Sequence, residues 1–287
     1  ACSSQSSSPL TIGLTYTPNI QFAPIYMAKK NSKYASGVSL RHHGAQEGLF
    51  DALLSGKEQL VVAGADEAVV AASNGSDLVV VGGYYQSYPA CLIVPENSPI
   101  KTPADLKGKT VGTPGRKGET WYALQLAMDT ASLSESDLTI QDIGYTQQAA
   151  LVGGKVDAVV GFSNNDAVQI KQAGTAVRTI QPAESIPLIG VSLVTTRKLL
   201  DSRREDLQAA VKASAEGMTA FVKDPDAAVE ATKEYVQDLV DSTQAANARE
   251  VAVATGKLVS GEGKAAVGSV RVDDFTPMIE FLASHKI

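Results

Sequence analysis

The fold of this chain is indicated first by residues 10–30, which read LTIGLTYTPNIQFAPIYMAKK. Residues 10–16 alternate apolar and small side chains, as strands do, and Thr17-Pro18-Asn19 breaks that pattern. A helical run follows at about residues 22–30. The stretch therefore predicts a strand, a turn and a helix.

The same alternation continues along the chain. Further strands are expected at residues 38–43, 59–64 and 78–82, with helices at 47–54 and from Asp66, a candidate N-cap, to Asn74-Gly75. Regular βαβα alternation predicts an α/β fold, with a parallel sheet covered by helices on both faces.

A second series of strands and helices begins after the turn-forming residues 95–102. Its expected strands are residues 110–112, 138–143, 157–162 and 176–180, and its helices lie at about 120–132 and 147–153. Residues 189–195 are expected to return as a strand toward the first series. From Lys198 the pattern is helical almost to the end, with stops at Asp224-Pro225-Asp226 and near residues 261–263.

The two series predict a two-lobed molecule. We expect a tether at residues 1–9, a first lobe formed by residues 10–92 and 195–287, and a second lobe, residues 93–194, inserted into the first. The chain would cross between them near residues 92–94 and 192–194. Ligands of open parallel sheets bind beyond the carboxyl ends of the strands, so the loops of both lobes are expected to face one cleft.

Composition limits the class of protein. With 287 residues and 44 % apolar content, the chain is long enough to form two domains with buried cores. A net charge of −6, with Lys and Arg scattered, argues against a nucleic-acid partner, because such binders usually carry a basic stripe. No run of eighteen apolar residues appears, so contact with a membrane would need a covalent anchor.

An anchor of this kind is indicated at the start of the sequence. Cys2 is followed by the polar residues 3–8, as in a bacterial lipoprotein whose signal peptide is cut before a lipid-bearing cysteine. The alternative is an incidental cysteine in a disordered terminus. Cys91, the other cysteine, lies in an apolar stretch and is expected in the core, so no disulfide framework is predicted.

Loops after three strands of the first lobe carry candidate ligand contacts. Tyr16, Asn19, Gln21 and Phe22 follow the first strand and offer polar groups and two rings, although a tight turn that caps a helix would use similar residues. Asp66 follows the third strand, where capping a helix is the alternative to touching a ligand. The segment Tyr84-Tyr85-Gln86-Ser87-Tyr88 follows the next strand, and three tyrosines so close together seldom all belong to a core.

Two loops of the second lobe supply further candidates. The loop from Gly112 to Trp121 contains Arg116 and Glu119, and its glycines and helix start suit a polar or anionic group. It lacks the spacing of a Walker loop or of a dinucleotide loop. Phe162, Asn164 and Asn165 end another strand, where neighbouring amides offer donors and acceptors to the edge of a heterocycle.

Catalysis is poorly supported by the sequence. His42 and His43 lie at a strand end and His285 in the terminal helix, with no cysteine nucleophile or G-x-S-x-G elbow to pair with them. No zinc-type spacing of Cys and His occurs. We therefore predict no enzymatic activity, no cofactor and no metal site.

The loops, taken in order, resemble those of solute-binding proteins for thiamine pyrimidine precursors and riboflavin, a branch of the type II periplasmic-binding fold that serves bacterial ABC importers. The resemblance runs from about Leu10 to the C-terminal helices. Its stretches are residues 16–24, residues 102–112, Pro114-Gly115-Arg116 followed by Gly118, and residues 156–160 with Asn164-Asn165. The segment at 103–108 is typical only of the broader superfamily, which includes sulfonate and nitrate binders. The first and third stretches together narrow the resemblance to the branch for thiamine precursors and riboflavin.

The resemblance implies that a flat, nitrogen-rich ring is held between aromatic side chains from both lobes. The implied contacts are Tyr16, Asn19, Gln21, Phe22, Tyr84, Tyr85 and Gln86 from the first lobe, Arg116, Glu119, Trp121, Phe162 and Asn164 from the second, and Asp66 and Asn165 as further candidates. It also implies an extracytoplasmic location, an ABC permease with its ATPase as partners, and a monomeric binding subunit.

Two alternatives stay open. Arg116 and Lys117 are compatible with a binder of sulfonate, nitrate or a similar anion, although a small anion has no ring to stack on the tyrosines. Eukaryotic relatives of the fold synthesise the thiamine pyrimidine and carry a cysteine-rich motif. No cysteine follows Cys91 in this sequence, which disfavours that chemistry.

Overall fold

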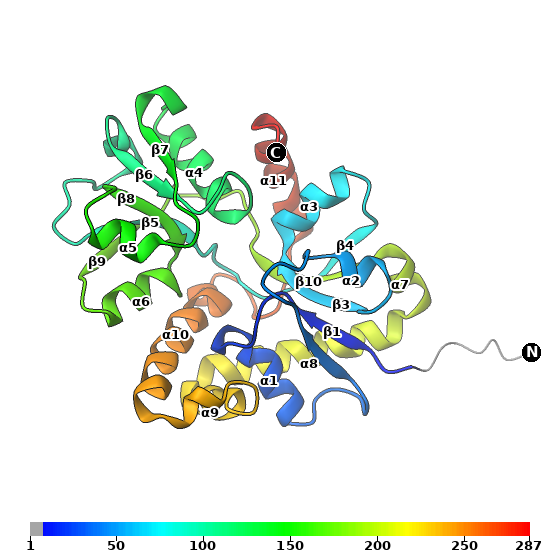
Figure 1. Ribbon diagram of the computed structural model, residues 1–287. Coiled ribbons are helices and arrows are strands. Elements are labelled where there is room, and N and C mark those ends of the chain that lie inside the picture. Colours follow the sequence, from blue (N-terminus) through cyan, green and yellow to red (C-terminus); the bar gives the residue numbers. More distant parts are fainter. Residues whose placement is uncertain (1–7) are drawn as a thin grey trace, which may run out of the picture. The chain divides into compact units, whose positions relative to one another are not determined.

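The computed structural model describes residues 8–287 and contains two compact units (Figure 1). Unit 1 consists of the residues up to Ser87 together with Ile189–Phe275, and unit 2 consists of Tyr88–Leu188 together with Thr276–Ile287. These boundaries differ from the expected ones, because the strands at both expected crossings lie whole within one sheet. The last residues also group with unit 2, whereas the sequence placed them in the first lobe.

Unit 1 is built on a five-stranded sheet. Its strand order is β2 (Ser39–His42), β1 (Thr11–Leu14), β3 (Leu60–Gly64), β10 (Val191–Thr196) and β4 (Leu78–Gly83). The pairs of β1 with β2 and β3 are parallel, whereas β10 runs antiparallel to both of its neighbours. The sheet is therefore mixed, and the prediction of a parallel sheet is wrong for β10.

Unit 2 repeats this arrangement. Its strand order is β7 (Thr139–Asp142), β6 (Thr110–Thr113), β8 (Ala158–Phe162), β5 (Ala90–Pro95) and β9 (Val177–Ile180). Here β5 is the antiparallel strand, paired with β8 and β9, so this sheet is also mixed. In each unit the strand that lies antiparallel is the one that follows a chain crossing. Helix-and-strand periodicity cannot reveal such a strand, because direction leaves no mark on the hydrophobic pattern.

The helices of unit 1 are mostly those expected. They are η1 (Ile20–Phe22), α1 (Ala23–Lys30), α2 (Asp51–Leu54), α3 (Ala65–Ser73), α7 (Arg197–Ser202), α8 (Arg204–Lys223), α9 (Pro225–Thr232), η4 (Gln237–Val240), α10 (Ser242–Ser260), η5 (Gly261–Gly263) and η6 (Val272–Asp274). The stop expected near Asp224 is confirmed: its side chain accepts a hydrogen bond from the Ala227 N–H and caps α9, with Pro225 in the first position. Gly261, in the left-handed region at φ 58°, ends α10.

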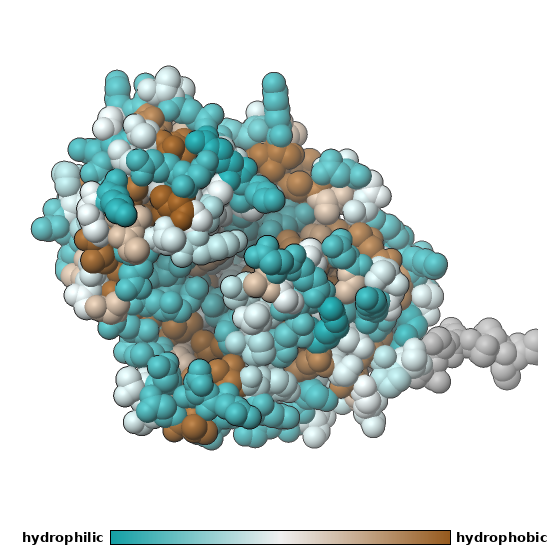
Figure 2. All heavy atoms as spheres, in the orientation of Figure 1, coloured by the Kyte–Doolittle hydropathy of each residue, from teal (hydrophilic) through white to brown (hydrophobic). Residues whose placement is uncertain are grey.

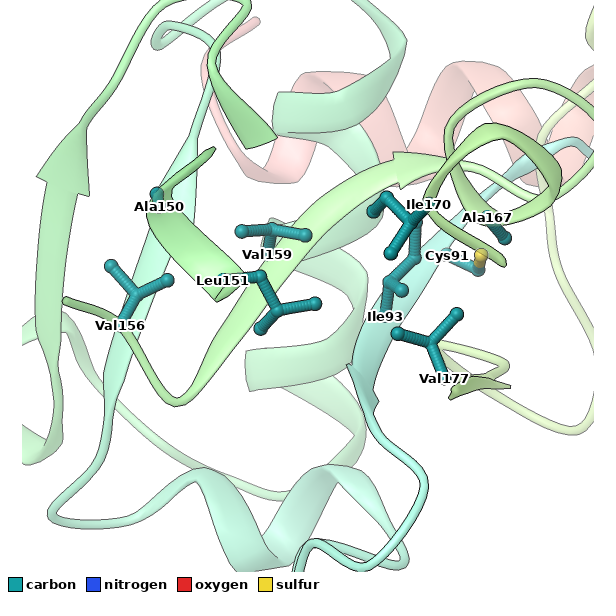
Figure 3. Packing of buried hydrophobic residues seen from close by; sticks show 9 residues of the cluster. All are labelled: Cys91, Ile93, Ala150, Leu151, Val156, Val159, Ala167, Ile170 and Val177. Atoms are coloured by element: carbon teal, nitrogen blue, oxygen red, sulfur yellow. The ribbon is translucent and has the colours of Figure 1, made fainter. Parts of the chain in front are cut away.

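The helices of unit 2 are η2 (Pro103–Leu106), α4 (Glu119–Thr130), η3 (Glu135–Asp137), α5 (Gln147–Val152) and α6 (Asp166–Gln172), and α11 (Phe275–Ser284) starts at the unit boundary. Figure 3 shows the core between the sheet and α5 and α6. Ile93 and Val159 from the strands pack there with Leu151 and Ile170 from the helices. Cys91 belongs to this cluster and is 1 % exposed, as the sequence predicted. α4 contacts β5 and β8 as well.

Close packing in unit 1 depends on two glycines. A Cβ atom on Gly217 of α8 would lie 2.1 Å from the carbonyl oxygen of Pro24, so glycine is what lets α8 approach α1. A Cβ atom on Gly83, at the end of β4, would lie 2.0 Å from the carbonyl oxygen of Ser269. The C-terminal segment can therefore run directly against the end of this strand.

The surface is mixed in character. On the face shown in Figure 2, hydrophobic residues form small separate patches among hydrophilic ones. Among the helices of residues 8–287, none combines the length and the apolar character needed to cross a bilayer.

Candidate functional site

The turn after β1 is shaped by the side chain of Asn19. Its Oδ1 accepts a hydrogen bond from the Gln21 N–H at 2.8 Å, and its Nδ2 donates to the Thr17 carbonyl oxygen at 2.9 Å. Both ends of this amide are thus used within the turn. In this structure Asn19 positions Gln21 and Phe22 at the start of η1.

Two tyrosines at the end of β4 meet this turn. The hydroxyl of Tyr84, whose side chain is 1 % exposed, donates to the Gln21 carbonyl oxygen at 2.7 Å. The Tyr85 hydroxyl lies 3.5 Å from Gln21 Oε1, and the two tyrosine rings pack edge to face with centroids 5.4 Å apart. Burial raises the pKa of Tyr84 well above its usual range, so its hydroxyl stays protonated and donates. The structure therefore gathers Gln21, Tyr84 and Tyr85 in one place.

Gln86, the next residue, contacts a different part of unit 1. Its Nε2 donates to the Ser269 carbonyl oxygen at 2.8 Å, and its backbone N–H donates to the Leu258 carbonyl oxygen at 2.7 Å. These bonds fix the segment after β4 against the C-terminal part of unit 1. The side chain thus has a structural role where the sequence suggested contact with a ligand.

A cluster of rings lies beside Gln21 and includes residues that the sequence did not suggest. Phe22 packs edge to face on His42, at the end of β2, with centroids 6.0 Å apart. Tyr26 from α1 stacks on Tyr235 at 4.0 Å with 14° between the ring planes, and both lie 5.7 Å from His42. We call Phe22, Tyr26, His42 and Tyr235 the aromatic cluster. In the sequence, Tyr235 lies between α9 and η4 and follows no strand, and so no motif pointed to it.

Charged residues hold the end of β2 next to this cluster. Arg41 donates to both oxygens of Glu47, at 2.7 and 3.1 Å, and to Glu58 Oε2 at 2.9 Å. His43 Nε2 lies 2.8 Å from each oxygen of Glu58, and both side chains are fully buried. The ligand atoms of His43, Glu47 and Glu58 lie within 4.8 Å of one another, a spacing that could suit a cation. Arg41 occupies both carboxylates, so the arrangement is an ion-pair network.

Tyr16 and Asp66 are the remaining candidates of unit 1. Tyr16 follows β1 and is 54 % exposed. The N-cap of α3 is Gly64, and Asp66 is the second residue of the helix, fully buried, with Oδ1 accepting from the Glu67 N–H at 2.8 Å. The prediction that Asp66 is the N-cap is therefore wrong. The helix begins earlier because β3 leads into it directly.

In unit 2, Arg116 lies on the surface among acidic groups. Its guanidinium contacts Glu135 at 3.0 Å and Asp142 at 3.2 Å, and it lies over the Trp121 ring, 5.4 Å from the centroid. One face of the Trp121 ring is therefore in cation–π contact with Arg116 from the preceding loop. The positive charge of Arg116 is matched by two carboxylates of the same unit.

The other candidates of unit 2 lie near helix starts. The Phe162 N–H donates to Asp166 Oδ2 at 2.8 Å, and Asn165 Oδ1 accepts from Gln169 at 2.7 Å. Burial raises the pKa of Asp166, and the N–H of Phe162 opposes this shift. Asn164 is 1 % exposed, and the carbonyl oxygen of Glu119, in the first turn of α4, lies 3.5 Å from the Tyr88 hydroxyl. Cys2 lies outside the described residues.

The arrangement of unit 1 is what a binding surface for rings needs. Tyr84 and Tyr85 contact Gln21, and the aromatic cluster adjoins it through Phe22. The polar groups of these side chains include hydroxyls and an imidazole. Comparison with known proteins identifies the family. Residues 19–228 match the model of a family described as NMT1/THI5 like.

The chain belongs to the NMT1/THI5-like family.

Two relatives found by sequence comparison are named as binding proteins. The riboflavin-binding protein RibY of Chloroflexus aurantiacus is 30 % identical over 235 residues, which cover 80 % of this chain and 67 % of RibY. A formylaminopyrimidine-binding protein of Halalkalibacterium halodurans is 24 % identical over 222 residues, covering 75 % of this chain and 67 % of the relative. These relatives confirm the resemblance found in the sequence and the prediction of a binding protein rather than an enzyme.

Solved structures show the same fold. The periplasmic aliphatic sulphonate-binding protein SsuA of Escherichia coli aligns with a TM-score of 0.75 at 19 % identity, over 97 % of this chain and 94 % of that one. At this sequence identity, the structural similarity is evidence for the fold alone. It confirms the prediction of a two-lobed α/β fold of the periplasmic-binding type with a helical C-terminal part.

Proposed function

We propose that this NMT1/THI5-like protein is the extracytoplasmic solute-binding subunit of an ABC importer and that its ligand is a small planar nitrogen heterocycle. The observation that carries the proposal is the gathering of Phe22, Tyr84 and Tyr85 around Gln21 in a chain related to RibY. Aromatic faces stack on flat rings, and amides pair with the donors and acceptors along a ring edge.

The two binding relatives support the class of ligand. One is named for riboflavin and the other for a formylaminopyrimidine, and both molecules contain a flat ring with nitrogen atoms and polar substituents. We infer that Tyr16, Gln21, Phe22 and Tyr85 of unit 1 contact the ligand, with Asn19, Tyr84 and Gln86 positioning them. For unit 2 we propose Trp121, Phe162 and Asn164 as ligand contacts.

The alternative of a sulfonate or nitrate binder has less support from the side chains. Arg116, the cation that kept this alternative open, is paired with Glu135 and Asp142. An anion would have to compete with two carboxylates for the guanidinium. The lipid anchor at Cys2 and the partnership with a permease and ATPase remain proposals that follow from the importer function.

Titration of the purified protein tests the proposed ligand class. Riboflavin fluorescence should fall as the flavin stacks on tyrosine rings, and the change should reverse on dialysis. An aliphatic sulfonate, added in a parallel calorimetric titration, should give no heat of binding. If the sulfonate gave a heat of binding, and riboflavin and a formylaminopyrimidine gave no binding signal, the anion binder would be favoured instead.

A further inference from the structure

The buried hydroxyl of Tyr26 fixes the tautomer of His42. The two groups lie 2.6 Å apart, between the Tyr26 hydroxyl oxygen and His42 Nε2, and Tyr26 is 1 % exposed. Burial raises the pKa of the Tyr26 hydroxyl, so the hydroxyl stays protonated. A buried hydroxyl proton needs an acceptor, and within residues 8–287 the acceptor in reach is His42 Nε2.

An imidazole whose Nε2 accepts a hydrogen bond carries its proton on Nδ1. Protonation of Nε2 would set a second donor against the Tyr26 hydroxyl, which is already donating there. Burial and the neighbouring His43 lower the pKa of His42, which agrees with a neutral ring. His42 is thus the Nδ1–H form rather than the Nε2–H form or the cation.

The Nδ1 side of this ring is open to solvent. Nδ1 makes no hydrogen bond within the described part of the chain, and it is not among the buried unpaired atoms there, whereas Nδ1 of the neighbouring His43 is. The hydroxyl of Tyr235, whose ring stacks on Tyr26, likewise makes no hydrogen bond within the described residues and is not among the buried unpaired atoms there. A fixed donor therefore lies at the carboxyl end of β2, with aromatic rings beside it.

The Nδ1–H donor of His42 adjoins the candidate site of unit 1. Phe22 touches His42 on one side, and the adjacent Gln21 is hydrogen-bonded to Tyr84. We propose that the Nδ1–H of His42 donates a hydrogen bond to an acceptor of the bound ring, a carbonyl oxygen or an unprotonated ring nitrogen. This inference rests on the proposed function. It makes His42 a specificity-determining residue, because a ligand with an N–H at that point would set donor against donor.

Nitrogen-15 NMR tests the tautomer without any ligand. The chain has three histidines, so long-range spectra of protein labelled in histidine can be assigned with His42→Gln and His285→Gln. His42 should show the Nδ1–H pattern, and Tyr26→Phe should move it toward the Nε2–H form. An Nε2–H pattern in the wild type, or no change in Tyr26→Phe, would overturn the inference.

Binding tests the role of the donor. In His42→Gln the amide oxygen can still accept from Tyr26, while the Nδ1 donor is lost, so riboflavin affinity should fall about tenfold. His285→Gln, in α11's C-terminal flank within unit 2, should bind as the wild type does. Unchanged affinity in His42→Gln would contradict the inference and leave the proposed function standing. If the wild type bound neither riboflavin nor a formylaminopyrimidine, the proposed function itself would fail, and the ligand role of His42 with it.

Discussion

Replacement of Glu58 by Gln should destabilise the protein far more than the same change at Glu47, although both carboxylates bind Arg41. Glu58 is fully buried and receives contacts from His43 at 2.8 Å and from Arg41 at 2.9 Å. Glu47 lies at the surface side of the network, with 24 % of its side chain exposed. Since the two variants change the same chemical group around the same guanidinium, the difference between them reports the burial of Glu58 together with its bond to His43.

The size of the effect follows from the bonds that are lost. In Glu58→Gln one acceptor oxygen becomes an NH2 group that faces a donor, and the buried charge that both neighbours need disappears. Loss of a charge-assisted hydrogen bond costs about 1.5–3 kcal/mol, and removing one partner of a buried ion pair costs about 3–5 kcal/mol. We therefore expect a loss of about 2–4 kcal/mol in the free energy of unfolding, because Gln keeps one acceptor. Glu47→Gln should cause a small fraction of this loss, since water can replace the lost contact.

Urea denaturation followed by far-UV circular dichroism measures both variants against the wild type. The midpoint should move to clearly lower urea for Glu58→Gln and only slightly for Glu47→Gln. Because the network holds the end of β2, where the His43 N–H donates to the Leu14 carbonyl oxygen at 2.8 Å, Glu58→Gln should also weaken riboflavin binding. Equal midpoints for the two variants, or a larger shift for Glu47→Gln, would refute the argument from burial.

Three further predictions concern the binding surface, the packing of α8 and the dependence on pH. Tyr85→Ala should weaken riboflavin binding by about 1–3 kcal/mol through loss of a ring contact. Tyr145 of unit 2 is 91 % exposed, and Tyr145→Ala should leave binding unchanged. Equal dissociation constants for the two variants in calorimetry would show that Tyr85 is not part of the site. Gly217→Ala should lower the free energy of unfolding by about 1–3 kcal/mol, because the added Cβ would meet a carbonyl oxygen. Gly256→Ala, whose Cβ would have its nearest neighbour at 3.9 Å, should instead stabilise α10 by about 0.5–1 kcal/mol. Thermal melts in the reverse order would contradict the packing of α1 on α8. The pKa of His42 is lowered from 6.5 in the folded protein, so the unfolded chain binds more protons below that pH. Stability should therefore fall as the pH drops from 6.5 through the pKa of His42 in the folded protein. If His42→Gln showed the same dependence of stability on pH, this contribution would be disproved.

The sequence predicted the fold well because strands and helices leave periodic patterns. The expected strands at residues 10–16, 59–64 and 110–112 correspond to β1, β3 and β6, with ends that differ by at most two residues. The direction of β5 and β10 left no trace, because a fully buried strand shows the same apolar run whichever way it pairs. The chain crossings were misplaced for the same reason.

The candidate site was predicted in part. Strand-end loops pointed to Gln21, Phe22, Tyr84 and Tyr85, which the structure brings together in unit 1. The sequence could not distinguish contact from support, and Asn19 and Gln86 proved to be tied to backbone groups. Tyr235 was missed because it follows a helix and reaches Tyr26 across about two hundred residues of sequence, a pairing that only tertiary structure creates.

Native mass spectrometry of the purified chain with equimolar riboflavin or formylaminopyrimidine tests most directly whether this protein carries a flat heterocycle without altering it. The proposed function predicts a complex of one protein with one ligand, and release of the ligand at its original mass when the protein is unfolded. A chain that holds neither compound, or that returns one of them chemically changed, would contradict the account.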